Sequence, residues 1–286
     1  MTANTMNTGI PYITIIVALL NGSRTIQRCL DSITGQTYPG WELIVQDGGS
    51  TDGSVEILKA NAHRIAYWES GPDQGPSDAV NKAIRRARGE WIFMLGSDDY
   101  LWDSSVLDHL VPHLRRAYPP LRVVYGRLAI VLDDSQVLEY LGEPWDRCKR
   151  RLIQGKTLPG PAVIYHRSLF DVHGLFDLSF DMAGDYELQL RALRRGDALY
   201  VPDVVVAGFQ YGGRSSVPEN ALLTLFAVRR AQRKNGIRFP SVLWIGWVSR
   251  VYLRLAIWRA LGAERAKRVL DWGRALWGKG PFWTRI

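Results

Sequence analysis

The sequence predicts an α/β fold, a doubly wound and mostly parallel sheet with helices on its faces. Short β-rich segments alternate with segments of helical spacing, and the connections between them are short. The central strand candidate, Trp91–Leu95, is apolar and uncharged, which is typical of a strand covered on both faces. Successive strand candidates are followed by aspartates. Together these observations indicate a parallel sheet with carboxylates gathered along one edge.

The first half of the chain supplies four strand candidates and three helix candidates. Strands are expected at residues 13–20, 41–45, 65–68 and 91–95, because each is an apolar segment bounded by turn residues. Helices are expected at residues 26–33, 55–58 and 77–87, where apolar side chains recur at helical spacing. Ser77 is the expected N-cap of the third helix, and Gly89 is expected to close it.

Four aspartates follow these strands: Asp47, Asp73 and the pair Asp98-Asp99. In open α/β sheets, ligands bind beyond the carboxyl ends of the strands. Two adjacent carboxylates repel each other there unless a cation or a ligand hydroxyl takes up their charge. Hard oxygen ligands of this kind suit Mg²⁺ or Mn²⁺ together with a diphosphate. The alternative is a set of solvated turns, in which Asp is common.

The second half of the chain continues with mixed elements. A helix is expected through residues 106–114, and strands are expected at 123–126 and 128–132, the second of which turns at residues 133–135. A helix should follow Asp185, and a last one should begin near Glu219 after a glycine-rich loop at residues 208–215. Asp185 is then either a functional carboxylate or the cap of its helix.

Composition narrows the class of protein. The chain has 286 residues, 47% of them hydrophobic, and only two cysteines, Cys29 and Cys148, so neither a disulfide framework nor a zinc site is expected. A reducing, cytosolic compartment is the default, and residues 1–11 lack the pattern of a signal peptide. The sequence contains neither G-x-G-x-x-G nor a Walker A motif, which argues against a classical dinucleotide fold and a P-loop enzyme.

The net charge of +8 is concentrated at the C-terminus. Residues 233–286 hold 12 Lys and Arg against Glu264 and Asp271, together with six of the 11 tryptophans. Basic, Trp-rich amphipathic helices lie in membrane interfaces. Arg250 and Arg254 interrupt the apolar stretch 242–258, which makes it a poor transmembrane span. We therefore expect this tail to lie on a membrane surface. The alternative is a helical appendage packed on the rest of the chain.

Several short motifs occur in the order of a known family. They are Leu20-Asn21-Gly22, Gln36-Thr37-Tyr38, Val45-Gln46-Asp47-Gly48-Gly49-Ser50-Thr51-Asp52, Asp78-Ala79-Val80-Asn81-Lys82, Gly96-Ser97-Asp98-Asp99 and Gly184-Asp185-Tyr186-Glu187-Leu188. With them the chain resembles family 2 glycosyltransferases of the GT-A fold over roughly residues 12–215. The branch it resembles most is the non-processive, bacterial exopolysaccharide and colanic-acid type. The Gln-x-x-Arg-Trp signature of processive synthases is absent.

The resemblance implies roles for individual residues. Asp47 corresponds to the carboxylate that reads the nucleotide base, and Asp98 and Asp99 to the ribose and metal pair of the D-x-D element. Asp185 corresponds to the general base. Gly96 stands where many members carry the first Asp of D-x-D, which leaves one carboxylate fewer for Mn²⁺ or Mg²⁺. The remaining residues assigned to nucleotide-sugar binding are Leu20, Asp73, Asp78, Lys82, His166 and Arg214.

Two of these assignments have plain alternatives. Lys82 and Arg214 are candidates for phosphate contacts, but a lysine is most often a solvated surface residue. His166 is a candidate for a contact with donor or acceptor, whereas a lone histidine after an apolar segment is more often a satisfied structural residue. The sequence alone leaves both alternatives open.

The implied activity is an inverting transfer of a sugar from a nucleotide sugar to a hydroxyl acceptor, here a lipid-linked or oligosaccharide acceptor. Residues 1–125 form the expected nucleotide-sugar-binding half, residues 126–235 the acceptor-binding half, and residues 236–286 the basic helical tail. We expect a cytoplasmic protein, peripheral on the inner face of the cell membrane. The alternatives are a sugar nucleotidyltransferase, whose Gly-rich basic loop is missing, and a nucleic-acid-binding protein using the tail, which leaves the aspartates unexplained. We expect no nucleic-acid partner.

Overall fold

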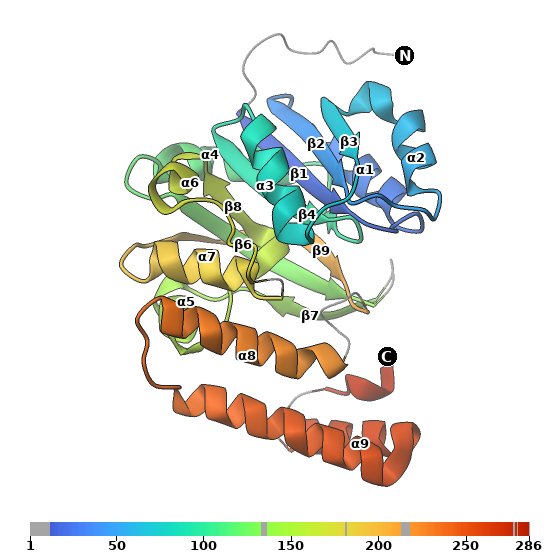
Figure 1. Ribbon diagram of the computed structural model, residues 1–286, viewed down its shortest axis with the longest axis vertical. Helices are drawn as coiled ribbons and strands as arrows, with labels where there is room; N and C mark the ends of the chain where they lie inside the picture. The colour runs from blue at the N-terminus through green and yellow to red at the C-terminus, as the bar shows by residue number, and fades with distance from the viewer. Residues whose placement is uncertain are drawn as a thin grey trace.

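The computed structural model describes residues 12–132, 136–180, 182–212, 218–276, 278 and 280–285. Its first half is a parallel α/β unit (Figure 1). The strands are β1 (Ile13–Leu19), β2 (Trp41–Asp47), β3 (Tyr67–Ser70) and β4 (Trp91–Gly96), and the helices are α1 (Ile26–Thr34), α2 (Ser54–Ala60) and α3 (Pro76–Arg86). A short 3-10 turn, Ala62–Arg64, precedes β3. β1 pairs in parallel with β2 and β4, so the carboxyl ends of these strands lie at one edge.

Alternation of side chains along the strands builds two cores, one on each face of the sheet. Ile13, Ile15 and Val17 of β1 pack with the buried faces of α1 and of α4 (Val106–Ala117). Ile16 points to the opposite face, where α3, α6 (Ser168–His173) and α7 (Gly184–Leu193) supply the buried apolar side chains. Burial on both faces explains why these strands are mostly apolar, and the buried Thr14 of β1 donates a hydrogen bond to Glu42 of β2.

The second half joins the same sheet through strands of both directions. It contains β5 (Tyr100–Leu101), β6 (Val123–Val131), β7 (Val137–Leu141), α5 (Trp145–Gln154), the 3-10 turn Gly160–Ala162, β8 (Val163–His166) and β9 (Leu199–Gln210). The strand order is β3-β2-β1-β4-β8-β6-β9-β5, with β7 beside β6. β8 runs antiparallel to both β4 and β6, whereas β6 and β9 are parallel. The fold is therefore a mixed α/β sheet with helices on both faces, as the sequence predicted.

Three local predictions need correction. Residues 123–131 form one strand rather than two, because Gly126 lies within β6 where a Cβ atom would meet Val206 at 2.6 Å. The cap of α3 is Gly75, not Ser77, since Pro76 already opens the helix. Helices α5 and α6 and strands β7, β8 and β9 were not predicted at all. The expected turn at residues 133–135 lies outside the described residues.

The C-terminal segment forms two helices below the sheet, α8 (Pro218–Lys234) and α9 (Val242–Ala275), and ends in a 3-10 turn, Trp283–Arg285 (Figure 1). α8 lies between α7 and α9. The long helix changes direction at Gly262, which has a φ of 72°. Asp271 then accepts hydrogen bonds from the backbone of Phe282, Trp283 and Thr284 and fastens the final turn. None of the helices in the described part of the chain is long and apolar enough to cross a membrane.

Candidate functional site

The carboxyl ends of β1, β2 and β4 bring several predicted residues to one edge of the sheet. In the strand register Leu19 is opposite Asp47, and Ala18 is opposite Gly96. Leu20, the first residue beyond β1, is 60% exposed at this edge. Asp98 and Asp99 follow β4 directly. The sequence-based expectation that these residues gather at one place is therefore met by the topology.

Asp47 is fully buried and holds the loop that follows β2. Its carboxylate accepts hydrogen bonds from the backbone of Gly49 at 3.1 Å and Ser50 at 3.0 Å. The hydroxyl of Ser70, at the end of the neighbouring strand β3, donates at 2.5 Å, and the Ser50 hydroxyl is a fourth donor. A contact with a nucleotide base would have to share or replace one of these bonds. Asp47 therefore organises the loop that would meet the base.

A second aspartate joins the loop after β2 to the loop after β1. Asp52 accepts from the backbone of Ser23 at 2.9 Å and from the hydroxyl and backbone of Ser54. These hydrogen bonds, the Ser54 hydroxyl first, lower the pKa of Asp52. Asn21, in the left-handed region with a φ of 51°, accepts in return from the backbone of Thr51 at 2.9 Å. These hydrogen bonds join the two loops into one rim.

Asp73, Asp78 and Lys82 lie together around the start of α3. Asp73 accepts from the backbone of Gly75 at 2.8 Å, and its carboxylate lies against Gly48, where a Cβ atom would meet it at 2.7 Å. Lys82 Nζ lies 3.2 Å from Asp78 and donates to the carbonyl of Pro72. Burial would raise the pKa of Asp78, but hydrogen bonds from Gln74 and Lys82 lower it overall. Lys82 therefore closes the loop before α3, near the same sheet edge.

Asp99 is the least satisfied carboxylate in this group. It is only 3% exposed, and its Oδ2 accepts from the backbone of Gly96 at 3.0 Å. Within the described residues its buried Oδ1 has no hydrogen-bond partner. Burial, and secondarily the negative charge of Asp98, raise the pKa of Asp99 well above its usual range. Such a group is an incomplete site, because a bound cation or hydroxyl would satisfy the free oxygen.

Gly96 explains how this pair is accommodated without the first aspartate of D-x-D. A Cβ atom at Gly96 would come within 2.7 Å of Asp98 Oδ1 and 3.0 Å of Asp99 Oδ2. The two carboxylates therefore fold back over the glycine and occupy the space of a larger side chain. Arg28 adds a positive charge beside them, since it donates to the Asp98 carbonyl at 2.9 Å and lies over the ring of Tyr100.

The donor set fits a divalent ion only in combination with a ligand. Among the described residues no group of three or more His, Cys, Asp or Glu side chains is arranged to hold a metal. The orphaned oxygen of Asp99 and the half-buried carboxylate of Asp98 supply hard oxygen ligands. Diphosphate oxygens of a bound nucleotide would have to complete the coordination. Asp98 and Asp99 are thus the residues that would hold Mn²⁺ or Mg²⁺.

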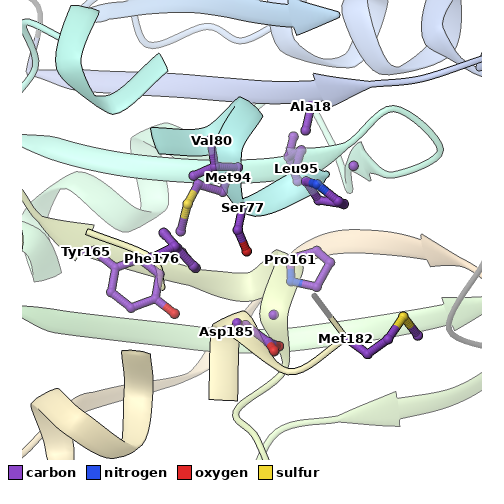
Figure 2. Close-up of a pocket in the computed structure, with 14 residues that line it drawn as sticks. Ala18, Ser77, Val80, Met94, Leu95, Pro161, Tyr165, Phe176, Met182 and Asp185 are labelled. Atoms are coloured by element: carbon purple, nitrogen blue, oxygen red, sulfur yellow. The ribbon is translucent and has the colours of Figure 1, made fainter. Parts of the chain in front are cut away.

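A cavity of about 270 Å³ connects this edge to Asp185 (Figure 2). Gly96 and Asp185 both line the cavity, and Figure 2 shows Leu95, the neighbour of Gly96, across from Asp185. The lining is largely apolar, and its side chains come from α3, β4, the 3-10 turn before β8 and the segment before α7: Val80, Met94, Leu95, Pro161, Phe176 and Met182. Ser77, Tyr165 and Asp185 are the side chains with polar groups in the lining. The general-base candidate therefore lines the cavity directly, whereas the metal-binding candidates adjoin it through Gly96.

Asp185 lies in the first turn of α7, and the cap of this helix is Ala183. Its Oδ1 accepts from the backbone of Tyr186 at 2.7 Å, and its Oδ2 faces the Thr157 hydroxyl at 3.3 Å. Burial raises the pKa of Asp185, and these two hydrogen bonds oppose the shift. A carboxylate of raised pKa at the wall of a cavity suits a general base.

Gly184 allows α7 to begin this close to α3. A Cβ atom on Gly184 would lie 2.6 Å from the Ser77 hydroxyl oxygen. Because the glycine leaves that space, Ser77 and Asp185 both face the cavity, as Figure 2 shows. The Gly-Asp pair in the sequence therefore has a packing reason, and the role of Ser77 changes from a cap to a lining residue.

A buried amide fixes the polar groups around Asp185. Gln189, fully buried one turn after Asp185, accepts from the backbone of Leu158 at 2.9 Å. Its Oε1 also lies 2.7 Å from Thr157 Oγ1 and therefore competes with Asp185 for the one hydroxyl hydrogen of Thr157. Its Oε1 must face the Leu158 N–H, so its Nε2 donates to the Tyr165 hydroxyl oxygen at 2.9 Å. The Tyr165 hydroxyl hydrogen is then free to point into the cavity. The sequence predicted no role for Thr157, Tyr165 or Gln189.

His166 lies at the opposite edge of the sheet and has a structural role. β8 is antiparallel to β4, so His166 pairs with Trp91 at the start of that strand. Its ring stacks on Tyr118 with centroids 3.6 Å apart, and its Nδ1 lies 2.9 Å from Ser168 Oγ. Burial lowers the pKa of His166 to about 4. The expected contact with donor or acceptor is therefore corrected to a satisfied core histidine. Arg214 lies outside the described residues.

Comparisons with known proteins agree with this architecture. The family model of glycosyl transferase family 2 matches residues 14–169. The chain is 28% identical over 265 residues to a PGL/p-HBAD biosynthesis glycosyltransferase of Mycobacterium bovis, covering 90% of this chain and 99% of that protein. It is 33% identical over 187 residues to an uncharacterized glycosyltransferase of Mycobacterium tuberculosis, covering 65% of this chain and 70% of the relative.

Two solved structures show the same fold. The mannosyltransferase PcManGT from Pyrobaculum calidifontis, in complex with GDP-Man and Mn²⁺, aligns with a TM-score of 0.60 at 21% identity and covers 94% of this chain and 81% of its own. S. aureus TarS 1-349 in complex with UDP-GlcNAc aligns with a TM-score of 0.59 at 19% identity, covering 77% of this chain and 66% of that one. Because the family model spans more than half of the sequence, the chain belongs to glycosyl transferase family 2 and is a glycosyltransferase.

Proposed function

We propose that this protein is an inverting glycosyltransferase that moves a sugar from a nucleotide-sugar donor to a hydroxyl acceptor. The observation that carries the proposal is the single cavity between Gly96, which adjoins Asp98 and Asp99, and Asp185. Attack and departure on opposite faces of the sugar invert the anomeric centre, by the same geometric logic as in inverting hydrolases. Complexes of related folds with UDP-GlcNAc and with GDP-Man and Mn²⁺ support a nucleotide-sugar donor.

The donor side uses the loops after β1, β2 and β4. Asp47 and Asp52 hold the rim against which the nucleoside would lie. Asp98 and Asp99 would hold a divalent ion, and that ion would neutralise charge developing on the leaving diphosphate. Arg28, fixed at 2.9 Å from the Asp98 carbonyl, contributes a further positive charge at this place. Lys82 remains a candidate for a phosphate contact once it leaves the Pro72 carbonyl.

The acceptor side uses the cavity wall formed by α7 and β8. Asp185 takes the proton of the acceptor hydroxyl as that oxygen attacks, and Tyr165 directs its own hydroxyl into the same space. The apolar lining excludes water from the reacting groups, which favours transfer over hydrolysis of the donor. Thr157, through its contact with Asp185, moderates the rise in the pKa of the base.

We further propose a lipid-linked acceptor and binding of the tail to the inner face of the cell membrane. The mycobacterial relative is named for PGL/p-HBAD biosynthesis. Phe239 and Val242 at the start of α9 are 82% and 85% exposed, and other large apolar side chains along this helix are exposed as well. Interleaved arginines make this surface basic. A surface that is both apolar and basic suits the interface of an anionic membrane.

The proposal is tested by binding and turnover of the full chain. Thermal unfolding with a panel of UDP-, GDP- and dTDP-sugars, with and without Mn²⁺, should identify one donor that raises Tm. Release of the nucleoside diphosphate should then depend on an added extract of bacterial lipids. In Asp185→Asn, donor binding should persist while turnover falls about 10²–10⁴-fold, the usual effect of losing a general base. Near-normal turnover by this variant would remove Asp185 from the mechanism, and the absence of any bound donor would refute the function.

A further inference from the structure

A row of arginines on α5 forms a second, separate concavity. Arg147, Arg150, Arg151 and Gln154 are spaced at i, i+3, i+4 and i+7, which places them on one face of the helix. They line a depression of about 280 Å³. All three arginines are exposed, and residues 143–156 hold five basic side chains against two acidic ones. This face of α5 takes no part in the site described above.

The neighbouring acidic side chains neutralise only part of the positive charge of the three arginines. Arg150 and Asp146 lie 3.7 Å apart with both side chains more than 70% exposed, so the pair is weak. Arg151 shares Glu143 with Lys156. In the described part of the chain no side chain is paired with Arg147. Three guanidinium groups around one depression match the oxygens of a phosphate, which arginine binds in a bidentate manner.

The end of α5 touches the start of α9, where the exposed apolar side chains begin. Ser241 donates a hydrogen bond to the Gln154 carbonyl at 3.0 Å, and Gly155 packs near the ring of Trp247. Phe239 and Val242, the most exposed of the large apolar residues, flank Ser241. In Figure 1 this end of α9 lies at the same side of the molecule as α5. The arginine depression therefore borders the apolar surface of the tail.

The same end of α5 is also close to the candidate base. Thr157, which contacts Asp185, follows Gln154 by only three residues. Three peptide units span at most about 11 Å between Cα atoms. The Gln154 end of the arginine depression is thus within about 11 Å of Thr157 along the chain. A sugar attached to a phosphate held there could extend toward the cavity, while its lipid chain could follow the apolar side chains of α9.

We propose that Arg147, Arg150 and Arg151 bind the phosphate of a membrane lipid that carries the acceptor sugar. The proposal rests on the lipid-linked acceptor inferred above. It adds a recognition site outside the tail and outside the donor site. The lipid chain remains in the membrane below α9, the phosphate lies on α5, and the sugar extends toward Asp185.

The test compares arginine variants of the full chain in co-sedimentation with vesicles. Vesicles contain phosphatidylcholine alone, or with phosphatidic acid, whose phosphate is exposed, or with phosphatidylserine at the same surface charge. The unchanged protein should prefer phosphatidic acid. Arg147→Gln/Arg150→Gln should lose about 30-fold in this binding, since each cation near an anionic surface contributes roughly a factor of five. Arg115→Gln/Arg116→Gln on α4 is the matched control for net charge and should change it little.

Other outcomes separate the possibilities. Equal loss in the two double variants would show that only net charge matters and would overturn the proposal. Inorganic pyrophosphate that binds the depression tightly without vesicles would assign it to a free phosphate, which also overturns a lipid site. Arg147→Lys/Arg150→Lys should recover part of the binding because charge remains but the bidentate geometry does not.

Donor-induced thermal stabilisation is measured in every variant. If it is absent even in the unchanged protein, the proposed function fails independently of this site.

Discussion

At the scale of single residues, the three aspartates of the site differ in how fully they are satisfied. Asp47 has four hydrogen-bond donors and serves the loop around it. Asp185 has two donors and a pKa raised by burial. Asp99 accepts from the Gly96 backbone on Oδ2 and lies near the backbone amide of Gln210, its Oδ1 has no hydrogen-bond partner among the described residues, and its pKa is strongly raised by burial. Asp47 is thus the most fully satisfied of the three and Asp99 the least, which is the order expected if Asp47 supports its loop and Asp99 awaits a ligand.

Asp99→Asn should stabilise the protein without metal and abolish its stabilisation by metal. The raised pKa means that the folded state favours protonated Asp99, so its favourable contribution is present at low pH and is lost as pH rises through the folded pKa. A neutral side chain avoids the buried charge. In EDTA at pH 8 we expect Tm to rise by about 2–4 °C, as for a gain of about 1 kcal/mol, and the gain to vanish toward pH 4.

The control for this prediction is Asp98→Asn, which alters a half-buried carboxylate and should change the metal-free Tm less. Addition of Mn²⁺ with a nucleoside diphosphate should raise Tm of the unchanged protein more than that of Asp99→Asn. A variant that is less stable at every pH, or one that gains as much from Mn²⁺, would contradict the assignment of Asp99 as an incomplete ligand site.

At the scale of elements, the sequence predicted those strands, helices and site residues that a local pattern of apolar residues or a short motif marks. The strands of the first half were recognisable because burial on both faces makes them apolar, and Asp47, Asp98, Asp99 and Asp185 followed from short motifs. Helix α5 escaped prediction because only Leu152 in it is buried, which leaves no apolar period to detect.

Direction and long-range contact account for the other misses. His166 is the last residue of β8, but β8 runs antiparallel to β4, so its end lies at the other edge of the sheet from Asp98. The contacts of Thr157, Gln189 and Tyr165 join residues 24 to 32 positions apart, and no local motif announces them. Such hydrogen bonds depend on how α7 meets β8 and the loop before it, which only the assembled fold determines.

The contact between Thr157, in the loop from α5 to β8, and Asp185 of α7 should affect the pKa of Asp185. Thr157→Val removes a hydrogen bond that lowers the pKa of Asp185, so that pKa should rise. The acid limb of the pH profile of kcat/KM should therefore move to higher pH, while activity near pH 9 changes little. Thr157→Ser keeps the hydroxyl and is the matched control. Thr157 is exposed, so neither change should disturb folding. An unchanged acid limb in Thr157→Val would mean that Asp185 is not the group that titrates.

At the scale of the whole molecule, the chain separates a packed catalytic unit from a thinly packed tail. Both cores are built from residues of the sheet and the helices up to α8. In α9, which runs from Val242 to Ala275, Ala266 is the buried residue of the part described, whereas Leu253, Trp272 and other large side chains are exposed. Exposed apolar surface on this scale marks an interaction site. The basic charge and the apolar character of this surface support the membrane contact proposed above.

Removal of α9 should abolish most membrane binding and leave the donor site intact. A chain that ends at Arg238 keeps the bonds from Arg229 to the carbonyls of Ile237 and Arg238, which fasten the end of α8. It loses the Trp244 and Ser241 contacts at the surface of α8 and α5. We expect donor-induced stabilisation to persist, because Asp47, Asp98 and Asp185 lie upstream.

Co-sedimentation with anionic and neutral vesicles measures the loss. Full-length protein should bind the anionic vesicles, and added salt should weaken this binding without abolishing it, because salt screens the charges but leaves the apolar contribution. The shortened chain should retain only the weak attraction of the α5 arginines. The membrane role of α9 fails if full-length protein does not bind anionic vesicles, or if the shortened chain does not fold. In either case α9 would be a structural part of the catalytic unit.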